Sequence, residues 1–159
     1  MTELDQLLMS HQQKSKNQKK KRPRLKHIEA GLWSLLKTGL QTTSRCIELT
    51  RLEAWNLPGI PDVLACNEDG CFSFLELKVR HGKKVKLSAH QVAWLSRHGH
   101  SNTFIVVRGP SLAINVYLGG ASVDLAMGDA DAVEALETFS EEPYDWEAFW
   151  ALTCPRLKV

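Results

Sequence analysis

The fold of this chain is decided by one stretch, residues 59–80, which reads GIPDVLACNEDGCFSFLELKVR. Two largely apolar runs, 60–66 and 71–80, flank the tetrapeptide NEDG at 67–70. Runs of this length bounded by turn residues predict β-strands, and NEDG is a composition typical of a tight turn. We therefore expect a β-hairpin in which the two strands lie side by side.

The second strand of this hairpin carries two opposite charges on one face. Its two-residue period separates the even-numbered from the odd-numbered side chains, with Phe72, Phe74, Glu76 and Lys78 on one face and Ser73, Leu75, Leu77 and Val79 on the other. Burying an unpaired charge in a central strand is costly, so the charges either pair with each other or serve a site at the edge of the sheet. A salt bridge alone would explain Glu76 and Lys78.

Asp62 favours the second explanation, because it opens the first strand fourteen residues before Glu76. In the hairpin the two carboxylates can lie near one another, within reach of one ion. Neighbouring carboxylates repel unless they are protonated or bridged by a cation, and hard oxygen ligands suit magnesium. The alternative for Asp62 is a simple turn aspartate after proline.

Lys78 and the backbone of Leu77 would complete such a site. The Lys78 ammonium could lie beside the metal, favour deprotonation of an attacking water and offset charge in the transition state. The backbone carbonyl of Leu77, between the two charged residues, could add another ligand.

Helices are predicted on both sides of the hairpin. Apolar residues recur at helical spacing from 27 to 40, with Leu36 and Trp33 assigned to the core and Gly39 placed to end the helix. A second helix over 87–99 has Ser88 as N-cap, Gln91 three residues later as in a capping box and a terminal glycine.

Further strands are predicted at 46–52, 103–107 and 112–118. The order is then helix, three-stranded meander, helix, and one or two further strands. A strand, a crossover helix and a strand form a right-handed unit with parallel strands, so we expect an α/β fold with a mixed sheet. Two more helices are expected around 130–139 and 144–152, with no chemical role assigned.

Charge divides the chain into three parts. The 20 basic and 18 acidic residues nearly cancel, but residues 14–26 hold eight of the former and residues 124–147 nine of the latter. We expect a flexible basic arm at 1–25, a core at 26–120 and an acidic helical extension at 121–159, packed on or beside the core. A basic arm can bind nucleic-acid phosphates, although a solvated tail or a localisation signal has the same composition.

Other classes of protein are disfavoured. No run approaches the length of apolar sequence that spans a membrane, and the N-terminus is polar, so we expect a cytoplasmic protein, in the host cytoplasm if it is phage-encoded. The four cysteines lack the spacing of zinc sites and are expected to be reduced.

The motif Pro61-Asp62, a spacer, and Glu76-Leu77-Lys78 resembles the signature of PD-(D/E)xK nucleases. The wider pattern GIPDVLA…FLELKV…LSAHQVAWL resembles the VRR-NUC branch and related Holliday-junction-resolvase-like enzymes, in which a glutamine-bearing helix follows the lysine strand. The likeness runs from about residue 27 to 108. It implies a restriction-endonuclease-like core and a Mg²⁺-dependent endonuclease acting on DNA, selective for branched or junction DNA, with Mn²⁺ able to substitute and a homodimer plausible.

The same resemblance implies roles for Glu29 and Gln91 in the site. Enzymes of this kind commonly take an acidic residue from an N-terminal helix, so Glu29 is a candidate catalytic residue and metal ligand, although it could simply favour the helix dipole. Gln91 matches the glutamine that reaches the metal and the phosphate. It also occupies the capping-box position, and because one amide should not fill both roles fully, we assign it to the site.

Contacts to DNA are expected from the basic arm and from the loop that joins the lysine strand to the glutamine helix. The candidate residues are Lys19, Lys20, Lys21, Arg22, Arg24, Lys83, Lys84 and Lys86. The acidic extension departs from the branch and could be a protein-interaction segment or a DNA mimic that shields the arm. The alternative to an enzyme is a DNA-binding protein that keeps the nuclease scaffold without catalysis.

Overall fold

The computed structural model of the chain describes residues 25–53, 56–140 and 142–157, with side chains described from residue 29 onward. Within these ranges the chain forms four α-helices, six β-strands and one short 3₁₀ helix. In chain order the elements are α2 (Leu25–Leu40), β1 (Ile47–Arg51), β2 (Val63–Asn67), β3 (Phe72–Val79), α3 (Ala89–Arg97), β4 (Thr103–Arg108), β5 (Ile114–Leu118), η1 (Gly119–Ala121), α4 (Ser122–Met127), β6 (Glu137–Phe139) and α5 (Trp146–Thr153).

The predicted hairpin is the structural unit formed by β2 and β3. Its strands are antiparallel, with Val63 opposite Leu75. Asn67 makes the turn possible because its side-chain oxygen accepts from the Asp69 and Cys71 N–H groups, at 3.1 and 2.9 Å. Gly70 has a φ of 75°, a conformation that costs glycine little. Local turn chemistry therefore fixes the register of the hairpin.

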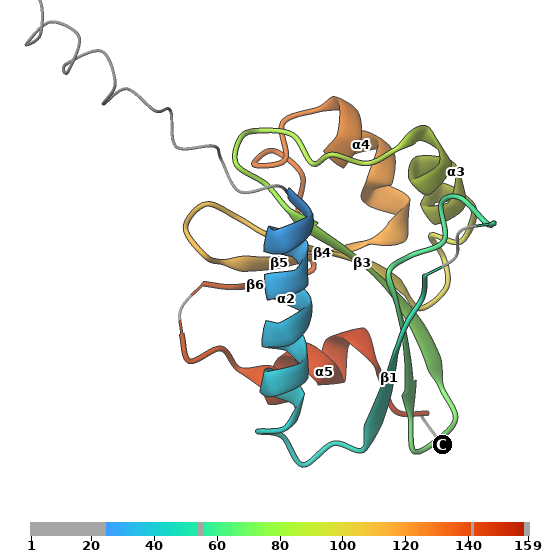
Figure 1. Cartoon of the computed structure of the whole chain (residues 1–159), viewed down its shortest axis with the longest axis vertical. Coiled ribbons are helices and arrows are strands. Elements are labelled where there is room, and N and C mark those ends of the chain that lie inside the picture. Colours follow the sequence, from blue (N-terminus) through green and yellow to red (C-terminus); the bar gives the residue numbers. More distant parts are fainter. Residues whose placement is uncertain (1–24, 54–55, 141, 158–159) are drawn as a thin grey trace, which may run out of the picture.

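All six strands form one mixed sheet in the order β1-β2-β3-β4-β5-β6. β3 and β4 are parallel and are joined through α3, whereas every other neighbouring pair is antiparallel. The predicted mixed sheet is confirmed. In Figure 1, α3 and α4 lie at the top of the view and α5 at the bottom, with the strands between them.

Two cores cover the two faces of this sheet. The first lies under α2 and α5 and contains Leu32, Leu36, Leu75, Leu77 and Trp150, among others. The second lies under α3 and α4 and includes Leu95, Ile105, Val107, Tyr117 and Leu125. The odd-numbered residues of β3 thus enter the first core, as the alternation predicts. The even-numbered residues, Glu76 among them, are left on the opposite face.

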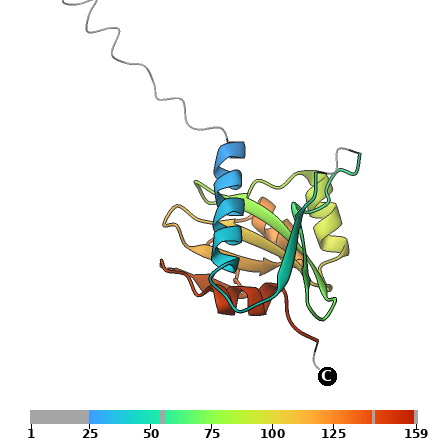
Figure 2. The ribbon, with the colours of Figure 1, turned by 60° about the horizontal axis from the view of Figure 1, so that its bottom comes forward.

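Helix α2 packs where the sequence places it. Leu36 is fully buried, as expected for a core residue, while Trp33 is half-buried against the first core and has the Lys37 ammonium 5.2 Å above its ring. Gly39 lets α2 approach α5, since a Cβ there would lie only 2.2 Å from the Trp146 ring. Figure 2 shows this meeting of the two helices.

The C-terminal region differs from the prediction. Residues 130–139, expected as a helix, form a loop followed by β6, and the helix of this region, α4, lies earlier. The residue composition of 130–139 favours a helix, but pairing with β5 determines the structure instead. The Leu136 N–H donates to the Val116 carbonyl, at 2.8 Å, and β6 pairs with β5 as the edge strand of the sheet. The second predicted helix is confirmed as α5, which is capped by Asp145 at the Ala148 N–H.

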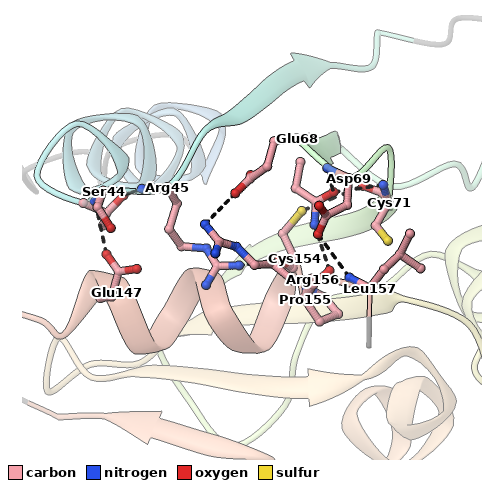
Figure 3. Close-up of polar contacts among 12 residues, drawn as sticks. Ser44, Arg45, Glu68, Asp69, Cys71, Glu147, Cys154, Pro155, Arg156 and Leu157 are labelled. Carbon is pink, nitrogen blue, oxygen red and sulfur yellow. Dashed lines mark hydrogen bonds and ion pairs between the residues drawn. The ribbon is translucent and has the colours of Figure 1, made fainter. Parts of the chain in front are cut away.

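The end of the described chain is tied to the hairpin turn (Figure 3). Three polar contacts make this connection: Asn67 Nδ2 to the Pro155 carbonyl (2.8 Å), Arg156 Nη2 to Glu68 Oε1 (2.6 Å) and the Leu157 N–H to Asp69 Oδ2 (3.2 Å). A further contact, from Arg45 Nη2 to the Cys154 carbonyl (3.0 Å), joins the end of α5 to the segment before β1. Residues after α5 therefore brace the turn end of the hairpin, opposite the end that holds Asp62. No helix in the described part of the chain is long and apolar enough to cross a membrane.

Candidate active site

The hairpin register brings the two predicted carboxylates together. Val63 lies opposite Leu75, so one further step sets Asp62 opposite Glu76. Asp62 is held on both sides: its backbone carbonyl accepts from the Leu52 N–H at 2.8 Å, and its Oδ2 accepts from the Leu77 N–H at 2.9 Å. Asp62 is therefore fixed between β1 and β3, at the open end of the hairpin.

The backbone of Leu77 faces the Asp62 carboxylate. Within a strand, the N–H and C=O of one residue point to the same side. Because the Leu77 N–H donates to Asp62, the Leu77 carbonyl also points toward the start of β2. The predicted third oxygen donor thus lies on the same side of β3 as the Asp62 carboxylate.

Glu76 is a fully buried carboxylate whose two oxygens differ in their surroundings. Oε1 accepts hydrogen bonds from Lys78 Nζ, at 2.8 Å, and from Gln91 Nε2. Oε2 is buried and has no hydrogen-bond partner among the residues that the structure describes. Burial, reinforced by the negative charge of Asp62, raises the pKa of Glu76 from 4.5 to about 8, although Lys78 opposes the shift. A nearby cation would relieve this cost.

Lys78 lies between two carboxylates. It is 8% exposed, with Nζ at 2.8 Å from Glu76 Oε1 and 3.8 Å from Glu29 Oε1. Burial lowers the pKa of the ammonium, but the charge and hydrogen bond of Glu76 outweigh that effect, so the pKa of Lys78 is raised. Lys78 is therefore a protonated donor at neutral pH. Glu29, on the first turns of α2, contacts the site through this lysine.

Gln91 forms the capping box and also contacts Glu76, so the expectation that one amide would not serve both positions fully was wrong, while its role toward a metal or a phosphate stays a prediction. Its Oε1 accepts from the Ser88 N–H at 2.9 Å, and the Ser88 hydroxyl accepts from the Gln91 N–H, which completes the capping box. Its Nε2 donates to Glu76. The two ends of one amide have different partners, so α3 is capped and Glu76 is anchored by the same side chain.

The basic loop that follows β3 is anchored by an acidic segment that the sequence analysis did not connect with it. Lys83 Nζ lies 2.9 Å from Asp129 Oδ2, and the Lys83 carbonyl accepts from the Ala130 N–H at 2.6 Å. The hydrogen bond that Lys83 donates to Asp129 raises the pKa of Lys83 and lowers the pKa of Asp129. Lys83 is thus engaged within the protein.

Arg80 holds the start of the same loop. Its guanidinium donates to the Gly82 carbonyl, at 2.9 Å, and to the Asp131 carboxylate, and the latter bond is the main cause of its raised pKa. Lys84 and Lys86 are exposed, and no ion pair joins either to another residue described by the structure. The three loop lysines are therefore not equivalent.

The residues fit a hard divalent cation. In the described ranges, no three His, Cys, Asp or Glu side chains are arranged to hold a metal ion. The candidate donors are instead two carboxylates, Asp62 and Glu76, and the Leu77 carbonyl, all of which are oxygens of the kind that Mg²⁺ prefers. The unpartnered Glu76 Oε2 is the atom that most needs such a partner.

The predicted DNA contacts of the arm, Lys19 to Arg24, lie outside the described residues. The first described residue, Leu25, begins α2, and Glu29 on the next turn of this helix contacts Lys78. The DNA contacts of the arm therefore stay a prediction.

No protein-family model and no curated protein matches the chain. Among solved structures it is similar to Hjc, a Holliday junction resolvase from the archaeal hyperthermophile Archaeoglobus fulgidus. The two chains are 18% identical over 58% of this chain and 73% of Hjc, with a TM-score of 0.40. A similarity this weak carries no argument about activity, and membership of the VRR-NUC branch stays a prediction.

Proposed function

We propose that this chain is a divalent-metal-dependent endonuclease that hydrolyses DNA phosphodiester bonds. One observation carries the proposal: Glu76 is fully buried, has one oxygen without a hydrogen-bond partner in the described ranges, and lies opposite Asp62, with the Lys78 ammonium beside it. Such an arrangement destabilises a fold, and charged groups in costly environments are characteristic of functional sites. A purely structural ion pair between Glu76 and Lys78 would not need a second carboxylate.

Asp62, Glu76 and the Leu77 carbonyl would hold the ion. Bound there, Mg²⁺, or Mn²⁺ in its place, would polarise a DNA phosphate and a water molecule. Glu29 as a further direct ligand stays a prediction, because its carboxylate is engaged by Lys78 at 3.8 Å.

The remaining residues act on charge and orientation. Lys78, kept protonated by its raised pKa, donates to the phosphate or to the attacking water and offsets the negative charge of the transition state. Glu29 orients this ammonium from α2, and Gln91 fixes the Glu76 carboxylate from α3. Three separate elements thus hold the reacting groups in place, which favours a rigid site.

DNA would approach along the basic loop and the basic arm. We assign phosphate contacts to Lys84 and Lys86, which are exposed, and to the arm residues Lys19, Lys20, Lys21, Arg22 and Arg24. Lys83, engaged by Asp129, contributes less. Selectivity for branched or junction DNA and action as a homodimer are parts of the same proposal.

Cleavage of DNA in the presence of Mg²⁺ or Mn²⁺ tests the proposal. Supercoiled plasmid and a panel of linear and branched DNAs would be incubated with the wild type, with Lys78→Ala and with Arg156→Ala, a matched cation removed from an exposed pair with Glu68. We expect cleavage by the wild type and by Arg156→Ala, and binding without cleavage by Lys78→Ala. Intact DNA with every metal would instead indicate a DNA-binding protein without catalysis.

A further inference from the structure

On the face of the sheet that carries Glu76, the described helices α3 and α4 build their core over β4 and β5. The core under α3 and α4 contains residues of β4 and β5 but none of β2 or β3. Phe74 lies beside Thr103 of β4 and opposite Leu64 of β2, and Phe72 lies opposite Cys66, so all of these belong to the same face as Glu76. Within the described residues, Phe72 and Phe74 give this part of the sheet an apolar surface that belongs to neither core, and Trp94, packed against the second core, lies at its border.

Three aromatic side chains follow one another on this surface. Phe72 is 56% exposed, while Phe74 and Trp94 are half-buried. The Phe74 and Trp94 rings meet edge to face, with centroids 5.2 Å apart, and the Trp94 ring stacks on His98 at 4.0 Å. We refer to Phe72, Phe74 and Trp94 as the aromatic platform.

The aromatic platform is continuous with the candidate site. Phe74 and Phe72 precede Glu76 by two and four residues on the same strand face, which corresponds to about 7 and 14 Å along β3. Trp94 follows Gln91 by three residues on α3, so the two side chains are neighbours on one helix surface. A strand of DNA with a phosphate at the candidate metal site would therefore pass over these rings within a few nucleotides.

We propose that the aromatic platform binds unpaired bases next to the scissile phosphate, so that the preferred substrate carries a single-stranded segment, as in a flap, a fork or an overhang. This inference rests on the proposed nuclease function and specifies its substrate class. Aromatic rings stack on any exposed base, whereas the bases of an intact duplex are already stacked on one another.

Charge supports a nucleic acid rather than an apolar protein partner. Arg97 is exposed three residues beyond Trp94, on the same stretch of helix surface, where it can contact a phosphate of the strand stacked on the rings. On the other side the platform leads past the candidate site to the basic loop, where Lys84 and Lys86 are exposed. An apolar surface with cations at both ends matches the alternation of bases and phosphates in a single strand.

Binding measurements without metal test this inference independently of cleavage. Fluorescence anisotropy in EDTA would compare a blunt DNA duplex with the same duplex carrying a single-stranded tail. We expect the wild type to bind the tailed duplex more tightly, and Phe72→Ala to bind it about tenfold more weakly while binding to the blunt duplex is unchanged. Phe72→Trp should keep the preference, and Phe72→Leu should lose it, because leucine is apolar but cannot stack.

Controls separate this result from a loss of folding or of self-association. Met127→Ala removes another exposed apolar side chain, 74% exposed on α4, and should bind both DNAs as the wild type does. Equal affinity of wild type and Phe72→Ala for the tailed duplex would overturn the inference, as would wild-type behaviour of Phe72→Leu. A second pair of results would also overturn the inference: Phe72→Ala converts a dimer to a monomer in sedimentation, and the variant still prefers the tailed duplex. The rings would then form a contact between two copies of the chain. Absence of cleavage with Mg²⁺ would refute the nuclease proposal and leave this binding result standing.

Discussion

Replacing Glu76 by glutamine should change how the stability of the metal-free protein depends on pH. The carboxylate is fully buried, and its pKa is raised from 4.5 to about 8 by burial and by Asp62. A carboxyl group with a raised pKa favours folding only while it is protonated. Its contribution is therefore fully present below about pH 4.5 and is lost progressively as the pH rises through about 8.

The size of the effect follows from the shift. One pKa unit corresponds to roughly 1.4 kcal/mol, and most of the shift of Glu76 is expressed between pH 5 and pH 8. The metal-free wild type should thus lose about 3 kcal/mol over this interval relative to Glu76→Gln, which has no proton to lose. In a chain of this length the difference corresponds to about 10 °C in Tm. Lys78 does not cancel it, because the raised pKa of that lysine lies above the interval.

The assay is thermal and urea denaturation in EDTA at several pH values for the wild type, Glu76→Gln and Glu48→Gln, a control on the exposed face of β1. As the pH rises, the free energy of unfolding of the wild type and of Glu48→Gln should decrease by the same amount, and both should decrease more than that of Glu76→Gln. Added Mg²⁺ should restore more stability to the wild type at pH 8 than at pH 5. Parallel pH profiles for wild type and Glu76→Gln would refute the reasoning.

Two further predictions concern the elements around the site. Lys84→Ala and Lys86→Ala should each reduce the salt dependence of DNA binding by about one counterion, measured as the slope of log affinity against log salt, whereas Lys83→Ala should change it little because Asp129 already engages that lysine. Equal slopes for the three variants would contradict the assignment. Ser88→Ala and Gln91→Ala should both lose about 1 kcal/mol from the cap of α3 in urea titrations. Only Gln91→Ala should also weaken Mg²⁺ binding, and a similar loss in Ser88→Ala would assign the effect to the helix rather than to the contact with Glu76.

Features that depend on local chemistry could be predicted from the sequence. The hairpin follows from its NEDG turn, the two faces of β3 from the period of a strand, and the start of α3 from the Ser88 cap. The opposition of Asp62 and Glu76 follows in turn from the register that this turn imposes. These signals involve residues within about twenty positions of each other, and they place most of the candidate site.

Features that depend on distant pairing could not be predicted. The segment at 130–139 has the composition of a helix, but residues 137–139 at its end pair with β5 and form β6. The contact between Lys83 and Asp129 joins residues 46 positions apart, and nothing in either neighbourhood indicates it. The double role of Gln91 was missed for another reason: an amide has an acceptor and a donor end, and only coordinates show that they face different partners.

Titration of Mn²⁺ into the metal-free protein by calorimetry tests most directly whether two acidic side chains on neighbouring strands share an ion. We expect the wild type and Glu48→Gln to bind the ion with equal affinity, and Asp62→Asn to bind it at least tenfold more weakly while remaining folded. Binding of Mn²⁺ to Asp62→Asn with wild-type affinity, or the absence of binding to the wild type, would contradict the account.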